Sequence, residues 1–366
     1  MESPVFTGSF DDVQEEFRRQ LWTDGLPIVP PTIERIERFL ERTARDPDES
    51  LGVLLPANVD ATIWSIAVNA VMAGCRPEYM PVLIGIVDAI ADPRFRIQDA
   101  GSTPGWEPLV IVSGPIVDEL GLNCGTGALR VGPQPNTTIG RFLKLYLRNV
   151  AGLKGPPGAT DKGTFGQSFF VALAENHHAV QAIGWPPYNV DVGFAADDSV
   201  VTVQSVVASS MPTYSAGERW ESHAELIAEV IGQGCWAYWS WVGMWFGSFH
   251  PLLVMTPNVA EKIAGDGASK DDIRQFLGRN VHLRARQLER YAWDVGITEF
   301  RLDRLVEQGR LPAEYAASAD PERLLPALPH PELVGIVVSG DPDRNQSKGF
   351  VQNHIQGPPT SRRIAG

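Results

Sequence analysis

The sequence VVTVQSVV, residues Val200–Val207, decides the fold of this chain. Five of its eight residues are valine and a sixth is threonine. β-Branched side chains are favoured in strands, where their restricted rotamers pack well on the pleated surface. We therefore predict that this segment is a strand in the interior of a β-sheet.

Short apolar runs and helical patterns alternate on both sides of this segment. The other expected strands are residues 51–55, 109–112, 169–173, 252–255 and 333–339. Apolar spacing, capping residues and Gly or Pro stops predict helices between them, within residues 11–22, 32–42, 60–73, 78–90, 138–150, 219–231, 258–264, 270–277 and 281–293. Strands that alternate with helices predict an α/β fold, with a mixed α+β fold as the alternative.

The length of 366 residues exceeds that of one ordinary domain, so we expect a helix-rich chain of two lobes around a mixed sheet. The N-terminal lobe would span residues 1–166 and the C-terminal lobe residues 167–366. We expect residues 341–348 to form a polar loop after the last strand. Both ends of the chain are expected to be loose.

Composition restricts the class of partner. The formal net charge of -13 argues against nucleic acid and against an anionic membrane surface, since either would need a clustered basic face. We find no secretory signal and no apolar stretch long enough to span a membrane, so the expected compartment is the cytoplasm. The remaining partners are a small-molecule substrate or other proteins. The three cysteines are an odd number and are expected to be free thiols.

Cys75 is the first candidate for chemistry. It stands next to Arg76 and just before Pro77, where a helix is expected to begin at Glu78. A helix N-terminus and a neighbouring cation both stabilise a thiolate, so we expect a lowered pKa and a reactive thiol. The alternative is a small buried side chain at a tight joint between two helices.

The glycine-rich segment 121–140 is a second candidate. Glycines, hydroxyls, an expected helix start and a cation occur close together, which is typical of a site for a carboxylate or phosphate. Its expected binding residues are Gly125, Asn136, Thr137, Thr138 and Arg141, with Asn136 or Thr137 capping the helix. Ordinary capping, with Arg141 paired to a structural carboxylate, is the alternative.

Glu175, His177 and His178 follow an expected strand and form a candidate acid/base group. We predict no metal site, since adjacent histidines of a strand point to opposite faces and no other ligand motif is present. A single general base is the preferred interpretation, with Tyr188 or His250 approaching from elsewhere in the fold.

Residues 235–250 are unusually aromatic. Neither a strand period nor a helical period places all of the rings on one face: Trp236, Tyr238, Trp239, Trp241, Trp245, Phe246 and Phe249. The segment is either a pocket for an apolar or planar ligand, in which Trp239 and His250 would contact the substrate, or a subunit interface. The interface interpretation predicts a homo-oligomer.

Three motifs resemble a known family: LWTDGLP at residues 21–27, NAVMAGCRPEYMP at residues 69–81 and NTTIGR at residues 136–141. The chain is similar, over most of its length, to a poorly characterised bacterial family associated with UGSC-motif (seleno)proteins. The association implies thiol or selenol redox chemistry by proximity alone. Cys124 stands where the family pattern has a small hydroxyl residue, and residues 235–250 are more aromatic than in the family.

These observations together favour an enzyme that acts on a small anionic molecule. Cys75 would supply a nucleophilic or redox thiol, and Glu175 with His177 or His178 would move a proton. A thiol-independent lyase, isomerase or hydrolase is one alternative, and a non-catalytic subunit that positions a separate redox protein is another. The sequence assigns no cofactor.

Overall fold

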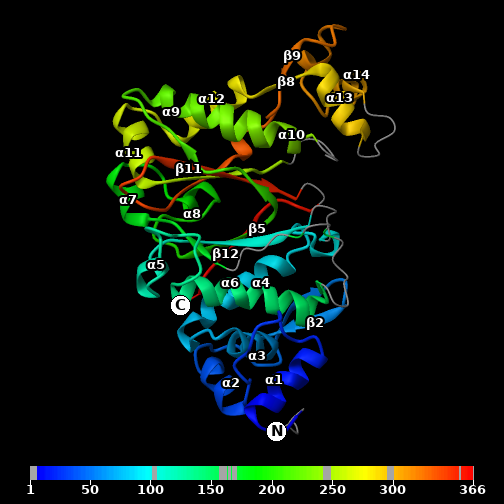
Figure 1. Cartoon of the computed structure of the whole chain (residues 1–366), viewed down its shortest axis with the longest axis vertical. Coiled ribbons are helices and arrows are strands. Elements are labelled where there is room, and N and C mark those ends of the chain that lie inside the picture. The colour runs from blue at the N-terminus through cyan, green and yellow to red at the C-terminus, as the bar shows by residue number, and fades with distance from the viewer. Residues whose placement is uncertain are drawn as a thin grey trace.

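The computed structural model describes residues 6–100, 105–155, 163, 166, 171–241, 249–294, 301–353 and 356–365. Most of its strands form a central mixed sheet, which lies between two groups of helices (Figure 1). The predicted α/β fold with a mixed sheet is therefore confirmed.

The central sheet has the strand order β10-β7-β11-β5-β3-β4, with β12 paired to β5 and β6 paired to β11. The β3–β4 and β7–β10 pairs are parallel, and the other pairs are antiparallel. The stretch that decides the fold is β5, which lies at the centre of this order. The bounds are β3 Glu107–Ser113, β4 Leu173–Ala174, β5 Val200–Ser209, β6 Thr213–Tyr214, β7 Leu252–Met255, β10 Gly335–Val338, β11 Gln346–Gln352 and β12 Thr360–Arg363.

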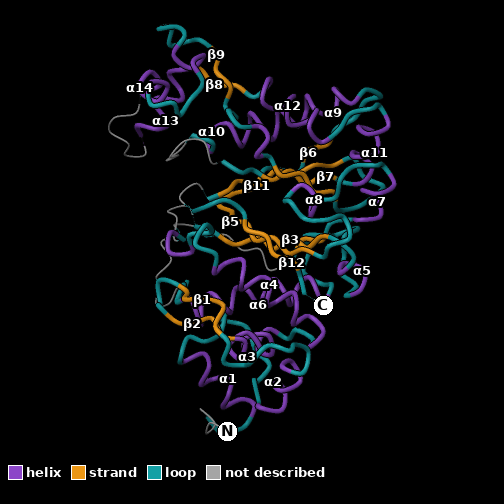
Figure 2. Tube along the Cα trace, turned by 180° about the vertical axis from the view of Figure 1, so that it is seen from behind, coloured by secondary structure: helices purple, strands orange, loops and turns teal. Residues whose placement is uncertain are grey.

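The sheet bends at β5 and forms two facing walls. The first residues of β5 pair with β12, and its last residues pair with β11. Figures 1 and 2 show the wall of β3, β5 and β12 below the wall of β7 and β11, with the short helix α8 (Tyr188–Asp191) between them. The two end strands meet where the Asn176 N–H, after β4, donates to the Val338 carbonyl of β10 at 2.8 Å.

The space between the walls is a separate hydrophobic core. Leu109 and Ile111 of β3 face this inner core, whereas Val110 and Val112 face the helices outside. This is the alternation of a strand that is buried on both faces. Tyr188 also belongs to the inner core, so α8 carries polar groups into the interior of the bent sheet.

Helices from the first 150 residues cover the lower wall. Helix α4 packs against β5 and β12, and α3 and α6 pack against each other below it, with α1 and α2 toward the N-terminus (Figure 1). The bounds are α1 Phe10–Arg19, α2 Ile33–Leu40, β1 Ser50–Leu54, β2 Val59–Thr62, α3 Ile63–Ala73, α4 Met80–Ala91, α5 Ile116–Glu119 and α6 Gln134–Tyr146.

Helices from the second half cover the upper wall. The π-helical segment Ile227–Trp236 packs directly on β11. Gly349 permits this close approach, because a Cβ at that position would lie 2.2 Å from Ile231 Cγ2. The bounds are α7 His177–Ala182, α9 Trp220–Leu226, α10 Ala237–Trp239, α11 Pro257–Gly265, α12 Lys270–Asn280, β8 His282–Arg284, α13 Ala285–Asp294, α14 Leu302–Glu307 and β9 Leu324–Pro326.

The last part of the chain differs from the expectation. Residues 341–345 form the expected loop, whereas residues 346–348 already belong to β11, which pairs with both β5 and β7. Its sequence, QSKGFVQ, has no β-branched run and therefore a low intrinsic strand propensity. The segment is a strand because it pairs with two neighbouring strands. The C-terminal segment was expected to be loose, yet β12 pairs with β5 and Thr360 Oγ1 donates to the Ala89 carbonyl at 2.8 Å.

The expected boundary at residue 166 does not separate two sheets. β3, from the first half of the chain, lies between β5 and β4 of the second half, and β12 packs against α4. The two halves are therefore interleaved in one sheet. Within the described ranges, no helix is both long enough and apolar enough to cross a membrane.

Candidate functional site

A cavity of about 370 Å³ opens at the end of the bent sheet where β7 and β10 begin. Its volume is within the range of small-molecule sites. Polar side chains converge on it from separate elements. Those that can carry a charge or form hydrogen bonds are Arg94, Tyr188, Asp191, Gln204, His250, Arg274, Glu332 and Ser361. Polar groups that gather at one end of the sheet, beside an apolar core, form the candidate site.

Tyr188 supplies a hydroxyl to this cavity. Its ring is almost fully buried in the inner core, and its hydroxyl lies 3.6 Å from the position that a Cβ on Gly335 would occupy. The hydroxyl makes no hydrogen bond to any described residue. Burial, and then the nearby carboxylate of Asp191, raises the pKa of Tyr188, so the group stays protonated. Tyr188 can therefore donate a hydrogen bond or a proton to a bound molecule.

His250 supplies a neutral imidazole. Its backbone is fixed on both sides, since the N–H donates to Gln352 Oε1 at 2.6 Å and the carbonyl accepts from Gln204 Nε2 at 2.7 Å. Neither ring nitrogen bonds to a described residue. Burial lowers the pKa of His250 to about 4, because the charged ring would lose its hydration. At neutral pH the ring can accept a proton from a bound molecule.

Fixed charges line the wall beside α8. Lys270 is buried, and its Nζ lies 2.8 Å from Asp191 Oδ2, while Arg274 Nη2 lies 3.3 Å from the same oxygen. Arg274 also donates to the Val334 carbonyl at 2.9 Å and forms an ion pair with Asp271. Two cations therefore hold the end of α8 in place, and the wall presents both signs of charge.

Glu175 lies beneath the same helix. Its Oε2 accepts the Tyr188 N–H at 2.8 Å, whereas its Oε1 is buried without a hydrogen-bond partner. Burial raises the pKa of Glu175 to about 7, against the opposing effect of Lys270. The carboxyl group is thus half-protonated near neutral pH, and it positions the residue whose hydroxyl faces the cavity.

The two predicted histidines do not join Glu175. The strand ends at Ala174, and Asn176 caps α7 by accepting the Ala179 N–H, so His177 and His178 lie in the first turn of a helix. His177 Nε2 lies 2.7 Å from a nitrogen of Gln181, and the largely exposed His178 pairs with Asp118 at 2.8 Å. The chain turns immediately after Glu175, and none of the hydrogen bonds or ion pairs among the described residues joins the Glu175 carboxyl to the side chain of His177 or His178. No group of three potential metal ligands occurs among the residues that the structure describes.

Cys75 does not have the activated thiol expected from the sequence. The turn Pro77–Tyr79 precedes α4, and Cys75 Sγ donates to the Thr138 carbonyl at 3.3 Å instead of facing helix amides. Desolvation raises the pKa of Cys75 to about 12, and the more distant positive charge of Arg141 only partly opposes it. The alternative, a small side chain at a joint between helices, fits this geometry.

Arg141 is committed to a structural ion pair. Its Nε and Nη2 each lie 2.9 Å from an oxygen of the buried Asp24, and Nη2 also donates to the Pro27 carbonyl. It does not line either of the two cavities built around polar or aromatic side chains in the described structure. The alternative interpretation, in which Arg141 pairs with a structural carboxylate, fits this geometry. The Nε and Nη2 donors are both used, so Arg141 cannot form a two-pronged contact with an anion through them.

The remaining residues of the glycine-rich segment also have structural partners. Helix α6 begins at Gln134, so neither Asn136 nor Thr137 is its cap, and the predicted helix start at Thr138 is wrong. The Asn136 amide is fully buried and bonds to the Ala172 carbonyl. Thr137 accepts the Gly132 N–H, Thr138 donates to the Gln134 carbonyl, and the Gly125 N–H donates to Asn123 Oδ1. An early Pro at the second helical position explains the earlier start.

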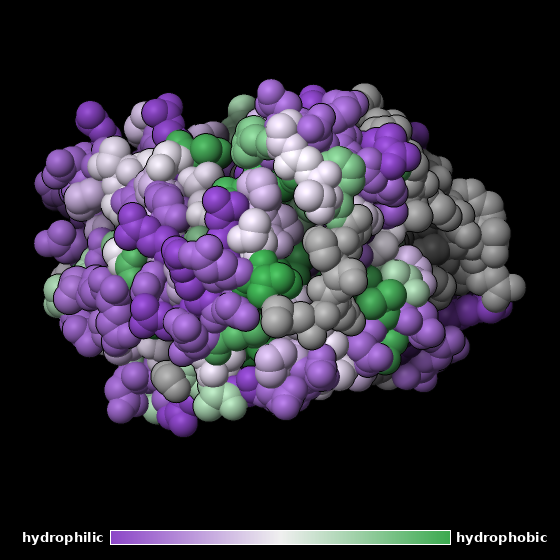
Figure 3. Space-filling model, turned by 90° about the horizontal axis from the view of Figure 1, so that it is seen from below, coloured by the Kyte–Doolittle hydropathy of each residue, from purple (hydrophilic) through white to green (hydrophobic). Residues whose placement is uncertain are grey.

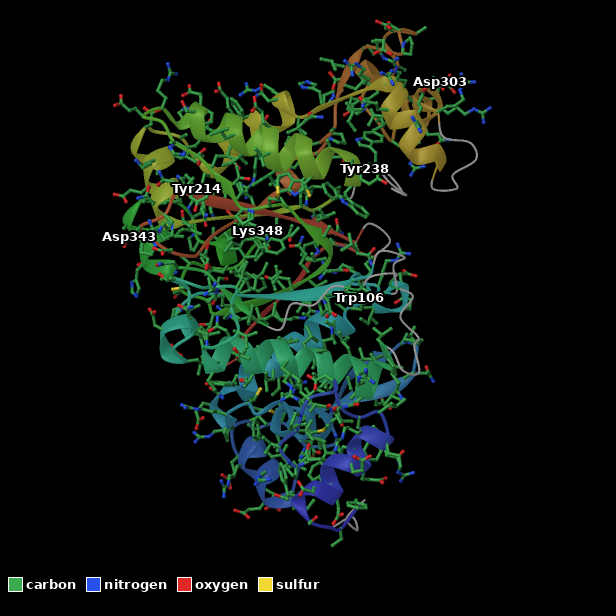
Figure 4. All side chains as sticks on the ribbon, viewed as in Figure 1. Trp106, Tyr214, Tyr238, Asp303, Asp343 and Lys348 are labelled. Carbon is green, nitrogen blue, oxygen red and sulfur yellow. The ribbon has the colours of Figure 1, made fainter. Side chains whose placement is uncertain are left out.

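The aromatic segment is divided between the core and the surface. Trp236, Trp241 and Phe249 are buried within the chain, and Trp239 packs partly buried against the same core. Tyr238, the middle residue of α10, is 44% exposed (Figure 4). Trp245 and Phe246 lie outside the described residues. Trp239 does not line the cavity that His250 lines, and the homo-oligomer stays a prediction.

Sequence reasoning missed the charged groups that hold α8. Asp191, Lys270 and Arg274 come from two distant helices, and no local pattern connects them. Gln204 was a sequence signal for a polar group inside the sheet, since a buried amide in the middle of a valine-rich strand needs a hydrogen-bond partner. Its partner in the structure is the His250 carbonyl.

Comparison with known proteins identifies no relative. No protein-family model, no curated protein and no solved structure matches this chain. The resemblance to the UGSC-associated family therefore stays an expectation from the sequence motifs.

Proposed function

We propose that this chain is an enzyme that moves protons on a small polar molecule in the cavity of Tyr188 and His250. The observation that carries the proposal is that the imidazole of His250 and the phenol of Tyr188 line one cavity, and neither side chain makes a hydrogen bond to a described residue. A base and an acid in one cavity are what a lyase, an isomerase or a hydrolase needs. This is the thiol-independent alternative of the sequence analysis.

Each group has a definite part in this proposal. His250 accepts a proton from the substrate, because its ring is neutral at neutral pH and neither ring nitrogen bonds to a described residue. Tyr188 donates a hydrogen bond, or its proton, to a substrate oxygen on which negative charge develops. Glu175 acts as a positioning residue through the Tyr188 N–H, and Asp191 with its two cations fixes the same helix.

The charges that line the cavity favour a polar substrate over a simple anion. Arg274 is already paired with Asp191 and Asp271, and Arg94 is paired with Asp92. Glu332 adds a carboxylate to the lining. A molecule that carries both acceptors and donors fits this mixed lining better than an isolated carboxylate or phosphate does.

The test is a screen of small hydroxy acids, amino acids and their amides with the full-length chain, with products detected by mass spectrometry. We expect turnover by the wild type, and a loss of roughly a hundredfold or more in the variants His250→Gln and Tyr188→Phe. His178→Gln and Tyr214→Phe are the matched controls, since both residues are exposed and lie outside the cavity. Full activity of His250→Gln would overturn the proposal.

A further inference from the structure

A second and larger cavity of about 810 Å³ lies at the N-terminal end of the molecule, between α1, α2 and α3. Its walls carry five aromatic rings, those of Phe6, Phe10, Phe17, Trp22 and Trp64. Figure 3 looks at this end and shows hydrophobic side chains grouped near the centre of a mostly hydrophilic face. Nothing in the chemistry proposed for the first cavity uses this region.

Apolar side chains at this cavity remain open to solvent. Phe10 is 59% exposed, Phe6 is 38% exposed and Ile33 is 39% exposed, and all three line the cavity. A grouped apolar surface of this kind marks a binding site more often than single exposed residues do. Phe17 and Trp22 are already packed edge to face, with ring centroids 5.3 Å apart, so part of the wall is preformed.

The polar groups of the cavity define what it could hold. Arg35 is the one charged side chain among the described residues that line it. Its Nη1 donates to the Pro30 carbonyl at 2.7 Å, and it has no carboxylate partner within the described ranges. Deeper in the wall, Asn149 donates to Asn69 Oδ1 at 2.8 Å, and its own Oδ1 is buried without a partner. Among the described residues, the cavity therefore has an apolar body and one positive charge, that of Arg35, without a carboxylate partner.

We propose that this cavity binds a small amphiphile with an apolar body and one carboxylate, such as a medium-chain fatty acid. The apolar part would cover the exposed rings, and the carboxylate would pair with the Arg35 guanidinium, which carries unused donors. The proposal is independent of the function proposed for the cavity of Tyr188 and His250, since the two cavities share no lining residue.

Isothermal titration of the full-length chain with decanoate, below its micellar concentration, tests the proposal. We expect saturable binding at one site, and a loss of about tenfold or more in Val13→Trp, where the larger side chain fills the cavity. Glu15→Trp is the matched control on the same helix, since Glu15 is exposed and does not line the cavity. Arg35→Gln should weaken the binding of decanoate by about threefold to fivefold and leave the binding of 1-decanol unchanged.

Four results would overturn the proposal. Absence of decanoate binding to the wild type is the first, and equal binding by Val13→Trp is the second. The third is binding that appears only after residues 1–5 are removed, which would mean that the chain itself occupies the cavity. The fourth is a dimer in sedimentation that Val13→Trp dissociates, which would mean that a second copy occupies it.

Discussion

Replacement of the buried carboxyl by its neutral isostere, Glu175→Gln, should stabilise the protein in alkaline solution and leave it nearly unchanged in acid. Glu175 is fully buried, and its pKa is about 7 in the folded protein against an ordinary value of 4.5. A raised pKa means that the folded state binds the proton more tightly than the unfolded state does. The contribution of the protonated Glu175 carboxyl to the free energy of unfolding is therefore fully present below about pH 4.5 and is lost as the pH rises through about 7.

The size of the effect follows from the same two values. A pKa of about 7 instead of 4.5 corresponds to a loss of about 3 kcal/mol in the free energy of unfolding once the carboxyl is ionised. Glutamine carries no charge at any pH, so the variant does not lose this part of the free energy of unfolding as the pH rises. It keeps an oxygen that can accept the Tyr188 N–H, which Glu175 Oε2 accepts at 2.8 Å.

Urea denaturation at pH 4.5 and at pH 8 measures the difference. We expect Glu175→Gln to be within about 1 kcal/mol of the wild type at pH 4.5 and about 3 kcal/mol more stable at pH 8. Glu119→Gln replaces an exposed carboxyl and should follow the wild type at both values. If the advantage of Glu175→Gln is the same at both pH values, the carboxyl is not titrated by burial and the reasoning is refuted.

Three further predictions concern the regions where the sequence and the structure disagree or where the cavity is narrow. In competitive alkylation of the folded protein near neutral pH, read by peptide mapping, Cys75 should label last, because its pKa is about 12; labelling first would contradict this. Arg141→Gln should lower the free energy of unfolding in urea by about 3 kcal/mol, since Asp24 is left charged and buried; a neutral effect would argue against a structural pair. Gly335→Val should abolish turnover in the substrate screen, as its Cβ would lie 3.0 Å from Leu252 Cδ1 and in contact with the Tyr188 ring and hydroxyl, so that its methyl groups occupy the cavity; unchanged turnover would place the chemistry elsewhere.

Local patterns predicted most of the elements of the fold. The valine-rich β5 and the apolar β7 and β10 were found because strands buried on both faces carry an uninterrupted hydrophobic signal. β11 and β12 were missed because their polar sequences become strands only through pairing with β5. The bend of the sheet could not be predicted, since it depends on which partners follow one another along β5.

The candidate site was predicted only in part. Glu175 and His250 were both named from the sequence, and the structure brings both next to α8, through the Tyr188 N–H and through the shared cavity. Cys75 and Arg141 were named from local charge and expected helix ends. Their partners, the Thr138 carbonyl and Asp24, are far away in sequence, and those long-range contacts decided their roles.

If histidine and tyrosine in the sheet cavity carry the chemistry, the thiol of Cys75 is dispensable for turnover. A comparison of kcat/KM for His250→Gln and Cys75→Ser on the same substrate, after both variants are shown to be folded, tests this. We expect a loss of roughly a hundredfold or more for His250→Gln and a change of less than about threefold for Cys75→Ser. A large loss in Cys75→Ser together with an active His250→Gln would contradict this expectation.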